Sequence, residues 1–201
     1  MKCRISNYSK VPISNNMMQR NITRIMDNHN MPEECTKAVL RVYNFMVDKN
    51  YFGGCHALSS VLYVILSELG LSPELCVGEC QTPRMLPFDH SWITVNDKII
   101  DLAIYYPLTQ QINSMGGPVI FGLDAITACT SRTQYGIDSG LPLAPDTELV
   151  INSNFVDYMD NFPLVKGGLW SLVMETIPTT SAITINDLKN RYGKVVRHCI
   201  K

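Results

Sequence analysis

The stretch of sequence that decides the fold is residues 53–70, which read GGCHALSSVLYVILSELG. Apolar side chains recur in it at the spacing of one helix face, and Cys55 lies three residues before the first of them, Leu58. The two glycines before the cysteine favour a tight turn, and the glycine that closes the stretch is a typical helix stop. We therefore predict an amphipathic helix over residues 55–69 with a cysteine in its first turn.

A cysteine in the first turn of a helix lies beside backbone N–H groups that have no partner within the helix, at the positive end of the helix dipole. Both features favour the thiolate, and the same N–H groups are suited to hold the oxyanion of a tetrahedral intermediate. Taken alone, Cys55 is equally compatible with a small buried core residue, which is the commoner role of an unpaired cysteine. The choice between the two interpretations depends on the residues that accompany it.

A second stretch, residues 90–102, reads HSWITVNDKIIDL and predicts two strands joined at Asn96 and Asp97, a pair typical of turns. With a two-residue loop, His90 and Asp101 are diagonal neighbours on the hairpin; with a four-residue loop, they lie directly opposite. Either register keeps them on one face, because side chains along a strand alternate with a period of two. An aspartate at the end of an apolar strand needs a partner, and His90 is the nearest candidate.

A thiol, an imidazole and a carboxylate are the groups that a cysteine-dependent acyl-transfer enzyme uses. The histidine takes the proton of the thiol, and the carboxylate orients the histidine and stabilises its cationic form. Each residue also has an ordinary structural interpretation, His90 as a packed or surface histidine and Asp101 as a turn or capping residue. Their occurrence together with Cys55 at a predicted helix start favours the catalytic interpretation.

These residues resemble a known family. The pattern is similar to the transglutaminase-like core of the papain-like cysteine enzymes over roughly residues 50–105, and it consists of Gly53-Gly54-Cys55, a helix ending in Leu69-Gly70, a strand that carries Gly78, His90-Ser91-Trp92, and Ile100-Asp101-Leu102. The resemblance implies an α+β fold in which an N-terminal helical layer, with the nucleophile at a helix N-terminus, packs on an antiparallel sheet.

The resemblance also implies roles for individual residues. Cys55 is expected as the nucleophile, His90 as the general base and acid, and Asp101 as the orienting carboxylate, and no cofactor or metal is expected. The interval between His90 and Asp101 is short for the family, which implies a tight hairpin.

Five further residues are candidates for the site. The family completes its oxyanion hole with a polar or aromatic group before the cysteine, and Asn50 and Tyr51 are the nearest such residues in sequence. For substrate binding we expect Trp92, His56, which directly follows the nucleophile, and Arg84, in the two-proline loop before the catalytic histidine. His56 is also compatible with an exposed or packed histidine, and Arg84 with a solvated arginine.

The chain length of 201 residues fits a single domain over 1–201, with N-terminal helices in 1–50, the catalytic core in 51–105 and an unassigned remainder in 106–201. Within these parts we expect helices over 16–28 and 146–158, and a helix between them that Asn30 caps.

Composition excludes some classes of partner. The formal net charge of -1 gives no basic surface for nucleic acid, and no run of ~20 apolar residues predicts a membrane span. The low content of charged residues, 17%, is compatible with a large core or with self-association as a homo-oligomer. Seven cysteines without an apparent signal peptide favour a cytoplasmic location.

Cys76 and Cys80 are separated by three residues, a spacing that allows a metal or redox interpretation. No second pair of similar spacing accompanies them, so we expect both to be packing residues on one face of a strand. A redox protein that uses this pair is the weakest of the alternatives.

The sequence thus predicts an enzyme that hydrolyses or transamidates an amide or thioester bond through a cysteine thioester. The expected substrate is a peptide, a protein or a small amide or thioester. The alternative is a catalytically silent transglutaminase-like protein that serves in binding or as a scaffold.

Overall fold

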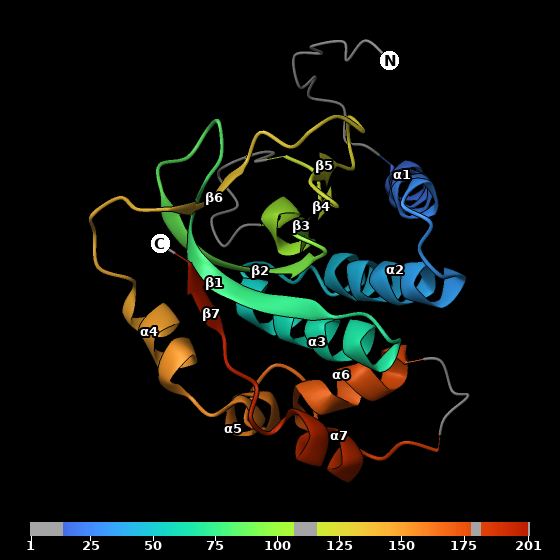
Figure 1. Cartoon of the computed structure of the whole chain (residues 1–201), viewed down its shortest axis with the longest axis vertical. Helices are drawn as coiled ribbons and strands as arrows, with labels where there is room; N and C mark the ends of the chain where they lie inside the picture. Colours follow the sequence, from blue (N-terminus) through green and yellow to red (C-terminus); the bar gives the residue numbers. More distant parts are fainter. Residues whose placement is uncertain (1–13, 107–115, 178–181, 201) are drawn as a thin grey trace.

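The computed structural model describes residues 14–106, 116–177 and 182–200, and it is an α+β structure (Figure 1). Three helices come first in the chain, and a sheet with further helices follows. The helices are α1 (Asn15–Asn28), α2 (Glu33–Asp48), α3 (Cys55–Glu68), α4 (Pro145–Asn152), α5 (Phe155–Asp160), α6 (Gly168–Thr176) and α7 (Ile185–Tyr192), and a single 3-10 turn, η1, covers Ala103–Tyr105.

The sheet is antiparallel except at its C-terminal strand. Its strands are β1 (Pro73–Gln81), β2 (Phe88–Val95), β3 (Lys98–Asp101), β4 (Val119–Ile120), β5 (Leu123–Asp124), β6 (Gln134–Ile137) and β7 (His198–Ile200). They follow the order β5-β4-β3-β2-β1-β6, and β7 pairs in parallel with β1. Segments from the middle and the end of the chain therefore complete the same side of β1.

Helix α3 is the centre of the molecule. It packs on β1 and β2 on one side and on α2 and α6 on others, and it lies between the sheet and the C-terminal helices in Figure 1. Nine of its residues between Ala57 and Leu66 are buried. This burial on nearly all sides explains why the helix is apolar around much of its circumference rather than along one narrow stripe.

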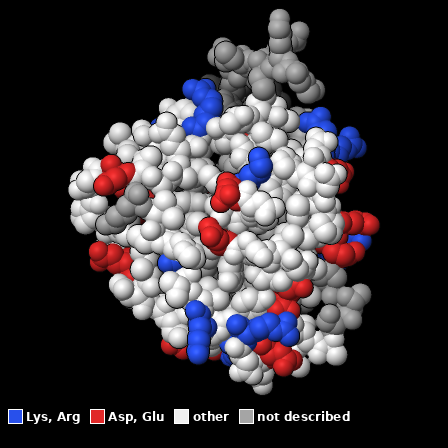
Figure 2. All heavy atoms as spheres, viewed as in Figure 1, with Lys and Arg blue, Asp and Glu red and all other residues white. Residues whose placement is uncertain are grey.

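The main apolar core joins side chains from the first helices to the last. It contains Met18 and Ile22 of α1, much of α3, and Trp170 of α6, which is fully buried. Uncharged residues cover most of the face shown in Figure 2, in keeping with the low charge content of the chain.

Two local predictions were wrong. Asn30 does not cap α2, because its φ of 54° places it in a turn, and Pro32 is the residue that precedes the helix. The single helix predicted over 146–158 is two helices. Ser153 is extended between them, and the side chain of Asn154 accepts hydrogen bonds from the first backbone N–H groups of α5.

Candidate active site

Cys55 is the first residue of α3, as the glycine pattern predicts. Gly54 occupies the N-cap position. Because glycine has no side chain, the first N–H groups of α3 have no capping side chain to which they can donate. A Cβ at Gly54 would collide with the ring of Tyr51, and the amide of Gly53 donates to the carbonyl of Tyr106 at 2.9 Å. The turn before the cysteine is thus held from two sides.

The predicted hairpin is confirmed in its two-residue form. Val95 pairs with Lys98, and Asn96 and Asp97 form the loop with φ values of 50° and 60°. Such a turn matches the twist of the strands and fixes their register. It brings His90 Nε2 to 2.8 Å from Asp101 Oδ2.

Asp101 is buried, and it accepts three hydrogen bonds. Besides His90, the hydroxyl of Tyr135 on β6 donates to Oδ2 at 2.8 Å, and the amide of Ile104 in η1 donates to Oδ1 at 3.2 Å. Burial, followed by the charge of Asp101, raises the pKa of Tyr135, so its hydroxyl stays a donor at neutral pH. The orientation of the carboxylate is therefore fixed from three directions.

His90 lies between this carboxylate and the cysteine. Burial by itself lowers the pKa of His90, but the charges of Asp101 and Cys55, together with hydrogen bonds to both, outweigh burial and raise this pKa to about 10. Since Nε2 is held by Asp101, the other ring nitrogen, Nδ1, is the one that remains for the thiol. The ring of Phe88 packs edge-on against the imidazole, with centroids 5.7 Å apart.

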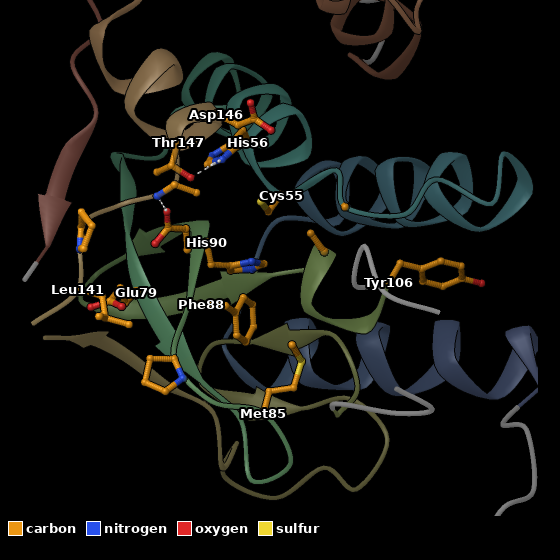
Figure 3. Close-up of a pocket in the computed structure, with 16 residues that line it drawn as sticks. Cys55, His56, Glu79, Met85, Phe88, His90, Tyr106, Leu141, Asp146 and Thr147 are labelled. Atoms are coloured by element: carbon orange, nitrogen blue, oxygen red, sulfur yellow. Dashed lines mark hydrogen bonds between the residues drawn. The ribbon is translucent and has the colours of Figure 1, made fainter. Parts of the chain in front are cut away.

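A cavity of about 510 Å³ opens beside these residues. Figure 3 shows Cys55 and His90 on one side of it, Glu79 and Leu141 on the opposite side, and His56 with Thr147 across the top. The walls come from the start of α3, from β1 and β2, and from the segment 141–147. A molecule in this cavity therefore lies against both the thiol and the imidazole.

His56 lines the cavity, but its ring is already held by the protein. Nδ1 lies 2.6 Å from the hydroxyl of Ser91, and Nε2 lies 3.5 Å from that of Thr147. Burial, then the positive charges of His90 and Arg197, lowers the pKa of His56 to about 4. The imidazole is therefore neutral over the physiological pH range.

The other predicted site residues lie elsewhere. Trp92 is buried against the ring of Tyr135 and does not line the cavity. Arg84 is exposed in the β1–β2 loop, and Asn50 is exposed after α2 with a φ of 47°. Tyr51 packs between the rings of Phe45 and Phe162, beneath the turn that precedes the cysteine, rather than in the cavity.

Sequence reasoning missed Tyr135 and the acidic residues of the cavity wall, Glu79, Asp89 and Asp146. Tyr135 reaches the site because β6 pairs with the far end of β1, a contact for which the local sequence carries no signal. Asp89 directly precedes the predicted catalytic histidine in the sequence. This adjacency was the one signal from which an acidic residue near the site could have been predicted.

Cys76 and Cys80 are both buried and free. Burial raises the pKa of each thiol, and that of Cys76 reaches about 11. Protonated buried thiols react slowly, which suits packing residues.

Over the residues that the structure describes, no group of three histidine, cysteine or acidic residues is arranged to hold a metal ion. Within the same residues, no helix is both long and apolar enough to span a membrane.

Comparisons with models of known protein families, with curated proteins and with solved structures yield no match for this chain.

Proposed function

We propose that this chain is a cysteine-dependent acyl-transfer enzyme with a transglutaminase-like, papain-like core. The observation that carries the proposal is the position of Cys55. It begins a buried helix next to His90, which is hydrogen-bonded to Asp101, and it opens into a cavity large enough for a substrate group. A buried residue with a strongly shifted pKa beside a cavity is a candidate for a functional site.

The reaction follows from these groups. His90 takes the proton of Cys55, and the sulfur attacks the carbonyl carbon of an amide, ester or thioester. The oxyanion of the tetrahedral intermediate is stabilised by the N–H groups at the start of α3. The intermediate collapses to a thioester on Cys55 as His90 returns its proton to the leaving amine, alcohol or thiol.

The second half resolves the thioester. Water or an amine attacks the thioester carbonyl, His90 removes a proton from it, and the thiol is regenerated as the acyl group leaves. Attack by water gives hydrolysis, and attack by an amine gives transamidation. The raised pKa of His90 makes its imidazole a good acceptor for the thiol proton.

The test is capture of the acyl-enzyme. The protein is incubated with peptide amides, thioesters and activated esters, and intact-mass spectrometry followed by digestion locates any adduct. We expect a thioester adduct on Cys55 that hydroxylamine releases, and no such adduct in Cys55→Ala. The matched control is Cys199→Ala, which removes the exposed free thiol at β7 and should leave acylation unchanged.

If Cys55 acquires no acyl group while Cys199 reacts as any free thiol does, the enzyme proposal is wrong. The alternative is then a catalytically silent protein of the same fold that binds a partner through the cavity.

A further inference from the structure

Apart from His90, the charged side chains on the cavity wall are carboxylates. Glu79, Asp89 and Asp146 line the cavity, and among the lining residues that the structure describes there is no lysine or arginine. Glu79 is buried at 8% exposure, Asp89 is half-buried, and Asp146 is exposed in the first turn of α4. The three carboxylates thus extend from the interior of the cavity to its mouth.

No ion pair in the described part of the chain neutralises these carboxylates. Glu79 accepts hydrogen bonds from the amide and hydroxyl of Ser139, at 2.8 and 2.5 Å, and Asp89 accepts one from the amide of Ala144. These donors are neutral, and the described ion pairs involve none of the three acids. Since carboxylate oxygens have two lone pairs each, the hydrogen bonds leave acceptor positions for a ligand.

The two imidazoles of the cavity do not reverse this sign. His56 is neutral at physiological pH, because its pKa is about 4. The positive charge of His90 is balanced by Asp101, to which it is bonded at 2.8 Å. Arg197 places a further positive charge near His56, but it does not line the cavity and no described ion pair joins it to the three acids. Three carboxylates against this one cation leave an excess of negative charge around the cavity, which attracts cations and repels anions.

We propose that the cavity selects an acyl donor that carries a positively charged side group, such as an ammonium or guanidinium, a few bonds from the reacting carbonyl. This inference rests on the proposed function and names its substrate class. It excludes donors attached to anionic carriers, because a phosphate or carboxylate in the cavity would face three like charges.

The cation belongs to the acyl donor rather than to the attacking amine. Nearby carboxylates stabilise an amine in its ammonium form, which has no lone pair with which to attack a thioester. An acidic wall therefore binds a cationic group that takes no part in the reaction, but it keeps an amine acceptor protonated and unreactive.

The cavity lining also has an apolar component. Leu141 lines it and is 70% exposed, and Met85, Phe88 and Pro142 line it as well. A lysine or arginine side chain consists of a short hydrocarbon stem that ends in a cation. A donor with such a side chain can place the stem against these apolar residues and the cation beside the carboxylates.

The first test measures the potential at Cys55 without relying on turnover. Methanethiosulfonates that carry a trimethylammonium, a methyl or a sulfonate group are compared; in each case the thiolate displaces methanesulfinate and forms a mixed disulfide. The ratio of cationic to anionic labelling rates at Cys55 is divided by the same ratio at Cys199, so that differences between the reagents cancel. We expect a quotient of about ten or more at low salt, which falls in 1 M salt.

Charge-neutral variants locate the effect. Asp146→Asn and Asp89→Asn should each lower the quotient about twofold to fivefold, and asparagine at 89 keeps an oxygen for the amide of Ala144. Glu148→Gln is the matched control, because Glu148 is exposed in the same first turn of α4 but does not line the cavity. A quotient of one or less in the wild type, or an equal fall in Glu148→Gln, overturns the inference.

A donor series separates this inference from the proposed function. Otherwise identical esters with lysine, norleucine or glutamate side chains are compared by the rate of Cys55 acylation. We expect the order lysine, norleucine, glutamate, with about tenfold between the first two. If norleucine reacts as fast as lysine, the cation preference is wrong and the enzyme proposal stands. If no donor acylates Cys55, both are overturned.

Discussion

Asp101 links more of the site than any other residue. It accepts hydrogen bonds from a histidine, a tyrosine hydroxyl and a backbone amide, and these come from β2, β6 and η1. A buried carboxylate is tolerated only when its lone pairs are used in this way. The same bonds that compensate its burial fix the plane of the His90 ring.

Replacing Tyr135 with phenylalanine removes one of these donors. We expect Tyr135→Phe to lower the free energy of unfolding by about 1 kcal/mol and to slow Cys55 acylation several-fold, because the carboxylate is held less firmly. Chemical denaturation and the acylation rate measure the two effects. Tyr192→Phe is the control, since the Tyr192 hydroxyl donates to Glu68 Oε1 at 2.6 Å and lies outside the described cavity lining.

The control should lose stability and keep the acylation rate of the wild type. If Tyr135→Phe also acylates at the wild-type rate, its hydroxyl does not contribute to positioning the site.

Whether a contact in the site could be predicted depends on how far apart in the sequence its two residues lie. His90 and Asp101 were placed together correctly because a two-residue turn and a period of two are local properties. Tyr135 was not predicted, because its contact with Asp101 spans 34 residues and depends on how β6 pairs with β1. Trp92 was expected near the substrate, yet its ring packs against Tyr135 and away from the cavity.

Among the helices and strands, α3 could be predicted from local sequence, whereas the pairing of the C-terminal strand β7 could not. The helix was predicted within one residue of its observed end, because glycines and apolar spacing mark it locally. The pairing of β7 with β1 was not predicted, since three exposed residues at the end of the chain carry no recognisable strand pattern. Strand pairing over more than a hundred residues is a property of the folded chain.

Gly78 is the position at which the backbone of β7 approaches β1 closely enough to exclude a side chain. Its backbone pairs with Ile200, and a Cβ there would collide with the carbonyl oxygen of Ile200. We expect Gly78→Ala to cost about 1–3 kcal/mol of stability and to release β7 selectively. Hydrogen exchange of the amides of residues 198–200 should then be at least about tenfold faster, an energy of roughly 1.4 kcal/mol, while the amides of α3 change little.

Leu75→Ala provides the comparison, because Leu75 lies on the same strand but contributes to the main core. It should lower stability without a selective effect on β7. If hydrogen exchange in Gly78→Ala accelerates equally in β7 and in α3, the collision with Ile200 is not the cause of the lost stability.

At the scale of the whole molecule, two histidines give the stability opposite dependences on pH. The pKa of His90 is raised to about 10, so its contribution is complete below about pH 6.5 and is lost as the pH rises toward 10. The pKa of His56 is lowered to about 4, so its contribution is complete above about pH 6.5 and is lost as the pH falls toward 4. Their sum is largest near pH 6.5.

We therefore expect the free energy of unfolding to fall on both sides of this pH. In His56→Asn the fall between pH 6.5 and 4 should be smaller than in the wild type by up to about 3 kcal/mol. His198→Gln, which changes an exposed histidine, should follow the wild-type curve. Denaturant titrations at several pH values supply the comparison. An unchanged fall in stability at acid pH in His56→Asn would contradict the neutral state of that partly buried ring.

Cys55 and His90 are proposed to act as a reactive pair, and the pH dependence of iodoacetamide labelling is the sharpest check of that pairing. Mass spectrometry follows each thiol in the wild type and in His90→Ala, with exposed Cys199 as the internal reference. We expect rapid labelling of Cys55 below about pH 7, well under the ~8.5 at which an ordinary free thiol becomes reactive, and loss of this reactivity in His90→Ala. If Cys55 labels no faster than Cys199 at every pH, the two side chains do not form a reactive pair.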